Sequence, residues 1–451
     1  PTVVVIPKQI KDKNNTAKEL STILNTSKED ILKHLNKNVS VEIIKPSGRK
    51  ISIEQATEIA KLNIDGVYIV GDTVRSYPYG NYLAPVIGIV GSDGQGLSGL
   101  EYQYDSYLKG SSGAIKLYVD AHGNLLEEIS DDYQSASSGF DLYLTIDLDI
   151  QLMIERIIDN IMIEYNPDEV IAIAANPKTM EIYAMASRPT FDPANYQDYD
   201  KELYNRNLPI FKTYEPGSVS KIVTFSAGLE ERVFKLTDTY HDLGYKMVGG
   251  VRIKDWKTGG HGTETYLEVL QNSCNPGFME IGLALGKEKL INYMKAFGYG
   301  SKTGIDLMGE TTGILFNPKN MGDVETATTA FGQGISVSAI QLITASSAAV
   351  NGGYLLKPTV LKALGISNTN EIIYQTTPQV VRQVISSETS KLVASSLEHV
   401  VSLGTGRSAY IEGYRFGEKT GTAQKVNNGV YMVGNYITSF IGFLPANDPE
   451  V

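Results

Sequence analysis

Ser218 and Lys221 place a hydroxyl and an amine three residues apart, directly before an apolar run. On a helix, that spacing puts both side chains on one face. Pro216-Gly217 interrupts the preceding segment, so Ser218 is predicted at a helix start, where free N–H groups and the helix dipole favour developing negative charge. Such a serine becomes a nucleophile only if Lys221 can take its proton, which requires desolvation or a second cation nearby. The pattern alone is weak evidence, because a capping serine followed by a solvated lysine would look the same.

Two further motifs follow in the order that this chemistry needs. Ser273-Cys274-Asn275 lies in the middle of the chain, and Lys419-Thr420-Gly421-Thr422 lies near its end. The order S-x-x-K, S-x-N and K-T-G is typical of penicillin-binding proteins and class A β-lactamases. Together the three motifs predict acyl transfer through a serine ester.

Longer blocks around these motifs resemble the class B penicillin-binding proteins, and within them the sporulation-specific branch. The resemblance implies an α+β fold, with a penicillin-binding/serine β-lactamase-like transpeptidase domain (a central antiparallel sheet flanked by helices) after an elongated α+β pedestal. It covers nearly the whole chain and is carried by Tyr214 to Lys221 (YEPGSVSK), Gln271 to Gly277 (QNSCNPG), Gly332-Gln333-Gly334, Gly404 to Arg407 (GTGR), Gly94 to Glu101 (GQGLSGLE) and Tyr410 to Gln424 (YIEGYRFGEKTGTAQ).

The resemblance assigns roles to the first two motifs. Ser218 would attack the peptide bond between the terminal D-alanines of a peptidoglycan stem peptide, and Lys221 would take its proton. Ser273 would carry that proton to the leaving amine, while Asn275 would hold Lys221 and the substrate amide. The amine of a second stem peptide would then resolve the ester and form a cross-link. This chemistry needs no cofactor, and β-lactam antibiotics would acylate the same serine.

The resemblance also assigns roles to the third motif. Lys419 would keep Lys221 neutral by its positive field and, with Thr420 and Thr422, would receive the terminal carboxylate of the substrate. Gly421 would leave room for a peptide along the strand edge. The backbone N–H groups of Ser218 and Thr422 would form the oxyanion hole.

A possible metal site precedes and includes the second motif. Cys274 is the only cysteine, and the stretch before it contains His241-Asp242, Asp255 and His261. Thiolate, imidazole and carboxylate ligands suit tetrahedral zinc. We therefore predict a structural zinc held by Asp255, His261 and Cys274, with His241 as the fourth ligand and Asp242 as the alternative. The simpler interpretation is that Cys274 is a small buried residue.

Composition and termini set the wider context. The net charge of −11 argues against nucleic-acid binding, and the single cysteine excludes an internal disulfide. The chain has no stretch of about 20 apolar residues that could span a membrane. By resemblance, we expect the protein to lie on the extracytoplasmic face of the cell membrane, anchored by an N-terminal transmembrane helix absent from this chain. A membrane-embedded glycan polymerase is the expected partner.

The local patterns divide the chain at a linker, and the resemblance implies a pedestal over residues 1–138 and a transpeptidase domain over residues 139–451. The pedestal has capped helix starts at Ser27 and Ser52, strands at Ser40 to Ile44 and Val67 to Val70, and a linker at Ser130 to Gly139. The second domain has a strand at Leu142 to Ile146, a helix at Ile150 to Ile163, and a hairpin of Val170 to Ala175 with Glu181 to Ala186. After the strand at Tyr436 to Leu444, we expect a last strand and helix outside this chain.

Three alternatives share the motifs. A class A β-lactamase needs a glutamate for deacylation, and Glu310 is a candidate, although its flanking Gly309 favours a turn. A β-lactam sensor would be acylated without transferring peptides. A non-enzymatic scaffold would carry the motifs as relics, and the intact motifs speak against it.

Overall fold

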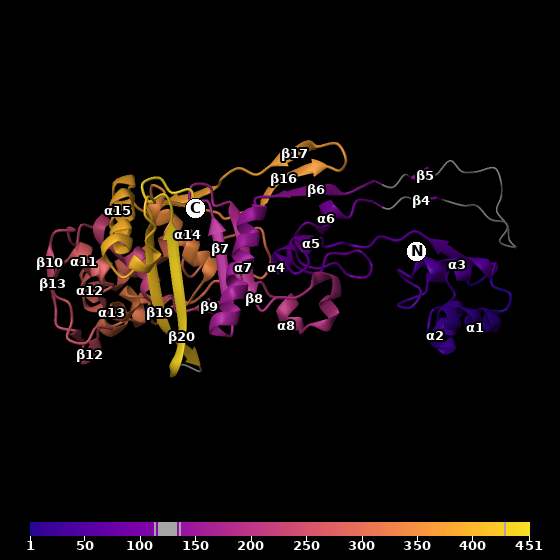
Figure 1. Ribbon diagram of the computed structural model, residues 1–451, viewed down its shortest axis with the longest axis horizontal. Helices are drawn as coiled ribbons and strands as arrows, with labels where there is room; N and C mark the ends of the chain where they lie inside the picture. Colours follow the sequence, from indigo (N-terminus) through magenta and orange to yellow (C-terminus); the bar gives the residue numbers. More distant parts are fainter. Residues whose placement is uncertain (112–113, 116–132, 135–136, 428–429) are drawn as a thin grey trace. The chain divides into compact units, whose positions relative to one another are not determined.

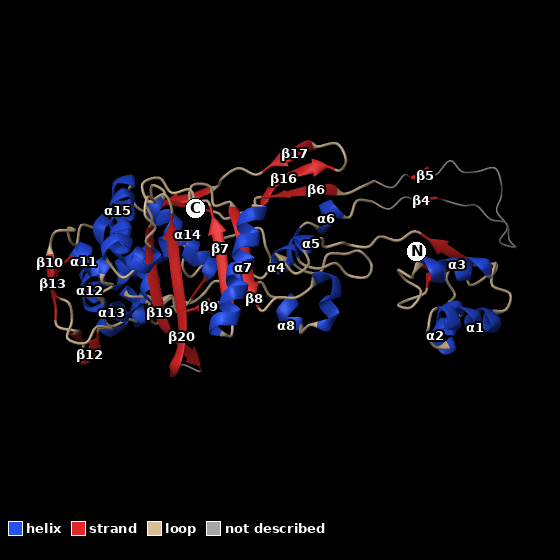
Figure 2. Cartoon of the chain, viewed as in Figure 1, coloured by secondary structure: helices blue, strands red, loops and turns tan. Residues whose placement is uncertain are grey.

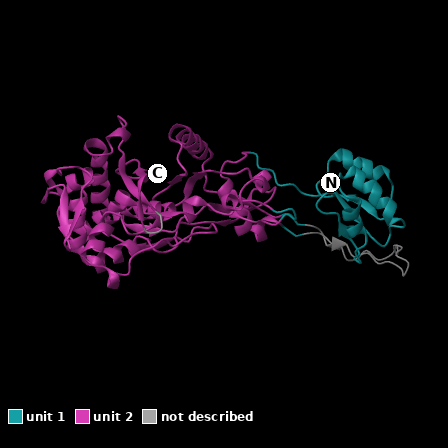
Figure 3. Ribbon diagram, turned by 90° about the horizontal axis from the view of Figure 1, so that it is seen from below, with its two compact units in different colours: residues 1–78, 91–94, 110–138 teal, residues 79–90, 95–109, 139–451 magenta. Residues whose placement is uncertain are grey.

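The computed structural model describes residues 1–111, 114–115, 133–134, 137–427 and 430–451, and it forms two compact units (Figures 1 and 3). Unit 1 contains residues 1–78, 91–94 and 110–138, and unit 2 contains residues 79–90, 95–109 and 139–451. Two segments of the predicted pedestal, 79–90 and 95–109, therefore pack within unit 2. Residues 130–132 and 135–136 of the predicted linker, Ser130 to Gly139, lie outside the described residues.

Unit 1 is a small α+β body whose local signals are confirmed. Ser27 caps one helix through the N–H of Asp30, and Ser52 forms a capping box with Gln55. The three-stranded antiparallel sheet has the order β2-β1-β3. The elements are β1 (Thr2–Val5), α1 (Lys13–Ile23), α2 (Lys28–Leu35), β2 (Glu42–Ile43), α3 (Ile53–Lys61) and β3 (Val67–Val70), with the short pair β4 (Ala114–Ile115) and β5 (Tyr133–Gln134).

Unit 2 is built around a buried helix, α10 (Lys221–Glu230). Its residues from Lys221 to Leu229 are all buried, because neighbouring helices cover it on several sides. The helices of this unit are α4 (Ala84–Ile87), α5 (Gly99–Gln103), α6 (Asp105–Leu108), α7 (Leu148–Tyr165), α8 (Lys201–Tyr204), α9 (Leu208–Phe211), α11 (Tyr266–Gln271), α12 (Asn275–Ala296), α13 (Asp323–Ala330), α14 (Ala339–Val350) and α15 (Ser387–Leu403). Short 3-10 turns are η1 (Pro193–Asp198), η2 (Gly217–Ser220), η3 (Pro318–Asn320) and η4 (Arg407–Ala409).

The strands of unit 2 form several antiparallel ladders (Figure 2). The predicted hairpin is present as β7 (Val170–Ala175) with β8 (Ile182–Arg188), and the third motif lies on β19 (Gly417–Asn427), which pairs with β20 (Val430–Phe443). One further sheet has three strands in the order β17 (Glu371–Gln375), β16 (Leu361–Ile366) and β6 (Phe140–Leu144). The remaining pairs are β9 (Thr213–Tyr214) with β14 (Val337–Ser338), β10 (Thr239–Asp242) with β13 (Gly262–Thr265), β11 (Tyr245–Val248) with β12 (Val251–Lys254), and β15 (Tyr354–Leu356) with β18 (Val380–Gln383).

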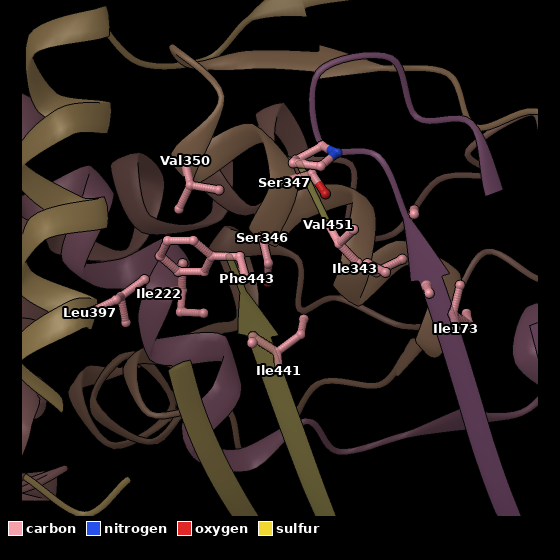
Figure 4. A pocket seen from close by; sticks show the side chains of 14 residues that line it. Ile173, Ile222, Ile343, Ser346, Ser347, Val350, Leu397, Ile441, Phe443 and Val451 are labelled. Atoms are coloured by element: carbon pink, nitrogen blue, oxygen red, sulfur yellow. The ribbon is translucent and has the colours of Figure 1, made fainter. Parts of the chain in front are cut away.

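The α+β class is confirmed, but the described strands do not form one continuous central sheet. The hairpins β7–β8 and β19–β20 are separate two-stranded ladders. An apolar pocket separates them, and Figure 4 shows Ile173 of β7, Ile441 and Phe443 of β20, and Ile222 of α10 around it. The side chains of β7 and β20 thus line an open space between the two hairpins, where no described strand pairs with either. The expected strand and helix beyond Val451 stay a prediction.

None of the helices in the described part of the chain combines the length and the apolar character needed to cross a bilayer.

Candidate active site

The turn that carries Ser218 is held by close backbone contacts. Ser218 lies in η2, which leads directly into α10. Gly217 has a φ of 54°, and its N–H donates to the carbonyl of Gly332 at 3.1 Å. A Cβ atom on Gly332 would lie only 2.0 Å from the Gly217 carbonyl oxygen, so Gly332-Gln333-Gly334 packs directly against this turn. The partly exposed Ser218 is therefore presented on a constrained backbone.

The first and second motifs meet at the amine of Lys221. This side chain is fully buried. Its Nζ lies 2.7 Å from the carbonyl oxygen of Ser273, 3.1 Å from Ser273 Oγ and 2.7 Å from Asn275 Oδ1. The three oxygens accept hydrogen bonds from Nζ and fix its position, and the Ser273 hydroxyl is close enough to exchange a proton with the amine. The arrangement suits a lysine that acts as a base.

The electrostatic surroundings favour that neutral form. Burial, followed by the positive charge of Lys419, lowers the pKa of Lys221 well below its ordinary value. Asp255, Cys274 and Glu264 act in the opposite direction, but they are smaller causes. A lysine with a lowered pKa can take a proton from a hydroxyl near neutral pH.

The second motif lies in the connection between α11 and α12. Ser273 adopts a positive φ of 53°, which is uncommon for a residue with a side chain. Cys274 caps α12 through the N–H of Gly277, and the N–H of Asn275 donates to Asp255 Oδ1 at 3.0 Å. These bonds fix the backbone that places Ser273 and Asn275 around Lys221.

The third motif packs tightly against the nucleophile turn. A Cβ atom on Gly421 would lie 2.9 Å from Val219 Cγ2 and 3.0 Å from the carbonyl oxygen of Pro216. The structure thus gives a reason for this glycine that differs from the predicted room for substrate, because the space beside Gly421 is occupied by η2. Its absent side chain lets β19 approach Ser218 closely.

Lys419 is fully buried on β19, and its Nζ donates to the carbonyl of Thr420 at 3.0 Å. Burial lowers the pKa of Lys419 to about 8, against the opposing charge of Glu418. Thr420 and Thr422 lie on the same strand, opposite Phe440 and Thr438 of β20. The roles assigned to these side chains in binding a carboxylate stay predictions.

Several candidate metal ligands lie together behind the second motif. Asp242, Asp255 and His261 have ligand atoms within 4.8 Å of one another, and so do Asp242, Glu264 and Cys274. Asp255 Oδ2 and His261 Nε2 lie 3.2 Å apart, and neither has a hydrogen-bond partner among the described residues. Asp242 is common to the two groups, but the predicted ligands Asp255 and His261 lie in one group and Cys274 in the other. Each group offers donor types that zinc accepts.

The structure favours Asp242 over His241 as a metal ligand, the reverse of the favoured prediction. His241 is outside both groups, and its Nδ1 lies 2.9 Å from Thr263 Oγ1. Its neighbour Asp242, which the sequence offered only as an alternative, belongs to both.

Glu264 was not predicted from the sequence. It lies on β13 across from Tyr240 of β10, on the same face as Asp242. The strand alternation of Gly262 to Thr265 was the signal that could have indicated it.

The carboxylate of Glu310 is held by hydrogen bonds to a neighbouring loop. Its Oε1 accepts from the N–H and hydroxyl of Thr303 at 2.5 and 2.6 Å, and its Oε2 accepts from the N–H of Gly304 at 3.0 Å. These contacts support the predicted turn and give Glu310 a structural role.

Comparisons with known proteins agree with this site. A family model described as "Penicillin binding protein transpeptidase domain" matches residues 170–451, and one described as "Penicillin-binding Protein dimerisation domain" matches residues 1–144. The chain therefore belongs to the penicillin-binding proteins that carry a transpeptidase domain. The predicted family, transpeptidase fold and serine acyltransferase class are confirmed, and the β-lactamase alternative is disfavoured.

Two individual relatives indicate which penicillin-binding proteins this chain resembles in sequence. Stage V sporulation protein D of Bacillus subtilis (strain 168) is 52% identical, over 100% of this chain and 70% of that protein. Peptidoglycan D,D-transpeptidase FtsI of Escherichia coli (strain K12) is 30% identical, over 98% of this chain and 73% of that protein. The similarity to the sporulation-specific branch is thus confirmed.

Solved structures show the same architecture. Penicillin Binding Protein 2X from Streptococcus thermophilus matches with a TM-score of 0.77 and 25% identity, over 100% of this chain and 72% of that one. Penicillin binding protein 3 from Mycobacterium tuberculosis, complexed with aztreonam, matches with a TM-score of 0.75 and 28% identity, over 86% of this chain and 83% of that one.

The effect of the Lys419 charge on Lys221 predicts how the rate of acylation depends on pH. Lys419→Gln removes a positive charge that lowers the pKa of Lys221, so the pKa of Lys221 should rise. The acid limb of the acylation rate should then move to higher pH, as measured with a fluorescent penicillin.

Lys221→Arg should be almost inactive, because a guanidinium keeps its proton. An active arginine variant would refute the role of Lys221 as a base.

The contact at Gly421 predicts a second effect. Gly421→Ala should slow acylation by roughly tenfold or more, because the added methyl group pushes β19 away from η2, at an overpacking cost of about 1–3 kcal/mol. The same penicillin assay and a melting curve measure the two effects. Gly71→Ala is the control, since a Cβ atom there meets nothing within 4 Å. Full activity of Gly421→Ala would show that the close approach is unnecessary.

Proposed function

We propose that this chain is a peptidoglycan D,D-transpeptidase that cross-links stem peptides through an ester on Ser218. The observation that carries the proposal is the buried amine of Lys221 held by Ser273 and Asn275. Lys221 takes the proton of Ser218 as the hydroxyl attacks the carbonyl between two terminal D-alanines. The bond to the last D-alanine breaks, and Ser273 passes the proton to its leaving amine.

The second half of the reaction reverses these transfers. The amine of another stem peptide attacks the ester, loses its proton to the same base and releases Ser218. The backbone N–H groups of Ser218 and Thr422 stabilise the oxyanion in both steps. Lys419, Thr420 and Thr422 bind the terminal carboxylate of the donor peptide. β-Lactams enter as analogues of that donor and acylate Ser218, in keeping with the aztreonam complex of the similar penicillin binding protein 3.

The biological setting follows from the relatives. The similarity to stage V sporulation protein D supports a role in the wall of the spore, and the similarity to FtsI keeps a division role as the second possibility. In either setting the enzyme works at the extracytoplasmic face of the membrane, held there by an N-terminal transmembrane helix, beside a membrane-embedded glycan polymerase.

Ser218→Ala tests the nucleophile. Intact-protein mass spectrometry with a fluorescent penicillin should show one adduct on the native chain and none on this variant. Ser220→Ala is the matched control, because this neighbouring hydroxyl is buried within the same motif and should leave the adduct intact. Transfer of a D-Ala-D-Ala donor to an added amine, together with a long-lived penicillin adduct, separates a transpeptidase from a β-lactamase or a sensor. An adduct that survives Ser218→Ala would place the nucleophile elsewhere.

A second proposal is a structural zinc held by Asp242, Asp255 and His261, whose ligand atoms lie within 4.8 Å of one another. The predicted fourth ligand, Cys274, lies in the second group, with Asp242 and Glu264. Three buried atoms without hydrogen-bond partners among the described residues support it: Asp255 Oδ2, His261 Nε2 and Glu264 Oε1. Burial and the neighbouring Glu264 raise the pKa of Cys274, so a metal would be needed to hold it as a thiolate. The zinc would tie this cluster to the backbone of Ser273 and Asn275.

Elemental analysis tests the zinc. The native chain should contain about one zinc per molecule, and Cys274→Ser should lose it together with thermal stability and acylation rate. His241→Ala should keep the metal, because His241 lies outside the cluster. Metal-free native protein that melts and acylates normally would leave Cys274 as a packing residue.

A further inference from the structure

Glu418, which directly precedes Lys419 on β19, is a buried acid that the proposed mechanism does not use. Its side chain is fully buried, and neither carboxylate oxygen has a hydrogen-bond partner among the described residues. Burying a carboxylate without partners is costly, so such a group needs an explanation.

The carboxylate lies against the loop that follows α15. A Cβ atom on Gly406 would lie 1.7 Å from Glu418 Oε1, so only glycine leaves space for the acid. The N–H and hydroxyl of the preceding Thr405 lie 3.0 and 3.2 Å from the carbonyl oxygen of Gln271, at the end of α11. The loop thus connects the region just before Ser273 with β19, and Glu418 is fixed between them.

The other charged groups near this end of β19 are at the surface or in the active site. The partner strand places Gly442 opposite Glu418. On α15, Glu398 pairs with Arg415, and Nδ1 of His399 bonds to the carbonyl of Ser395. Arg407, in the loop after α15, is exposed. In the active site, Lys419 and Lys221 are both fully buried, and the acids Asp255 and Glu264 act on Lys221.

We propose that Glu418 is a positioning residue for acylation: its buried carboxylate is the fixed counter-charge that keeps Lys419 an ammonium in the free enzyme. The proposal rests on the serine acylation proposed above. Successive residues of a strand point to opposite faces, so the two charges act on each other across the strand. A contact ion pair would occupy the donors of Lys419, whereas a counter-charge on the far face leaves them available to the carboxylate of the substrate.

The mutual influence of the two groups is consistent with this arrangement. Burial is the larger cause for both groups: it lowers the pKa of Lys419 to about 8 and raises the pKa of Glu418, and the charge of each group acts on the other against burial. Each charge therefore offsets part of the cost of burying the other. Lys419 can then remain charged while Lys221, which it faces, stays neutral.

The pH profile of acylation by a fluorescent penicillin tests the proposal in Glu418→Gln and Glu418→Ala. Without the carboxylate, Lys419 should lose its proton at lower pH, so the alkaline limb should move to lower pH by roughly one unit. Below that limb the rate should stay close to that of the native chain. Glu418→Ala is included because a buried amide without partners could prevent Glu418→Gln from folding. Glu418→Asp keeps the charge and should keep the native limb.

Glu398→Gln is the matched control, because it removes a carboxylate from α15 at the surface and should leave both limbs in place. Neutral variants that lower the melting temperature but keep the native limbs would show that Glu418 is only structural, and would overturn the proposal. A chain that forms no adduct at any pH, in native and variant forms alike, would instead reject serine acylation itself. The two failures are therefore distinguishable.

Discussion

The acyl-transfer site depends on keeping one buried amine neutral. Lys221 is surrounded by the helices that cover α10, so an ammonium at its end would have to exist without water. Lys419 is also fully buried, and its positive charge lowers the pKa of Lys221. Since two adjacent buried cations would repel each other, one of them gives up its proton. Burial and the charge of Lys419 favour the neutral form of Lys221, while the oxygens of Ser273 and Asn275 hold its amine in place.

Three distant parts of the chain converge on this amine through backbone contacts that only glycine allows. Gly332 packs on the turn before Ser218, and Gly421 brings β19 against the same turn. Behind the site, Gly404 lies against the carbonyl of Gln271, where a Cβ atom would be 2.5 Å away. Such contacts position the three motifs relative to one another more firmly than flexible side chains could. A tight backbone frame is what a reaction needs when its groups must be in place before substrate arrives.

The sequence predicted the features that depend on local patterns. Helix starts at Ser27 and Ser52 follow from capping residues, and the hairpin β7–β8 follows from two apolar runs around a turn. The three motifs could be assigned because their types and order are specific to one chemistry. The pairing of β10 with β13, which brings Asp242 and Glu264 together, could not be predicted, because it joins segments about twenty residues apart with no strong turn signal. The burial of Glu418 depends on the loop at Gly406 and was equally inaccessible from the sequence.

The acids behind the second motif impose a further constraint on Lys221. Asp255 and Glu264 raise its pKa, while burial and Lys419 lower it, so two opposing fields meet at the reactive amine. The same acids are needed in place, because Asp255 holds the N–H of Asn275 and Glu264 accepts from Asn272. Removing them would therefore loosen the motif that surrounds Lys221. The zinc proposed above would cancel part of their charge and leave these hydrogen bonds intact. Even without a metal, Lys419 is a larger influence on the pKa of Lys221 than either acid, so the acids can hold the second motif in place while Lys221 keeps its lowered pKa.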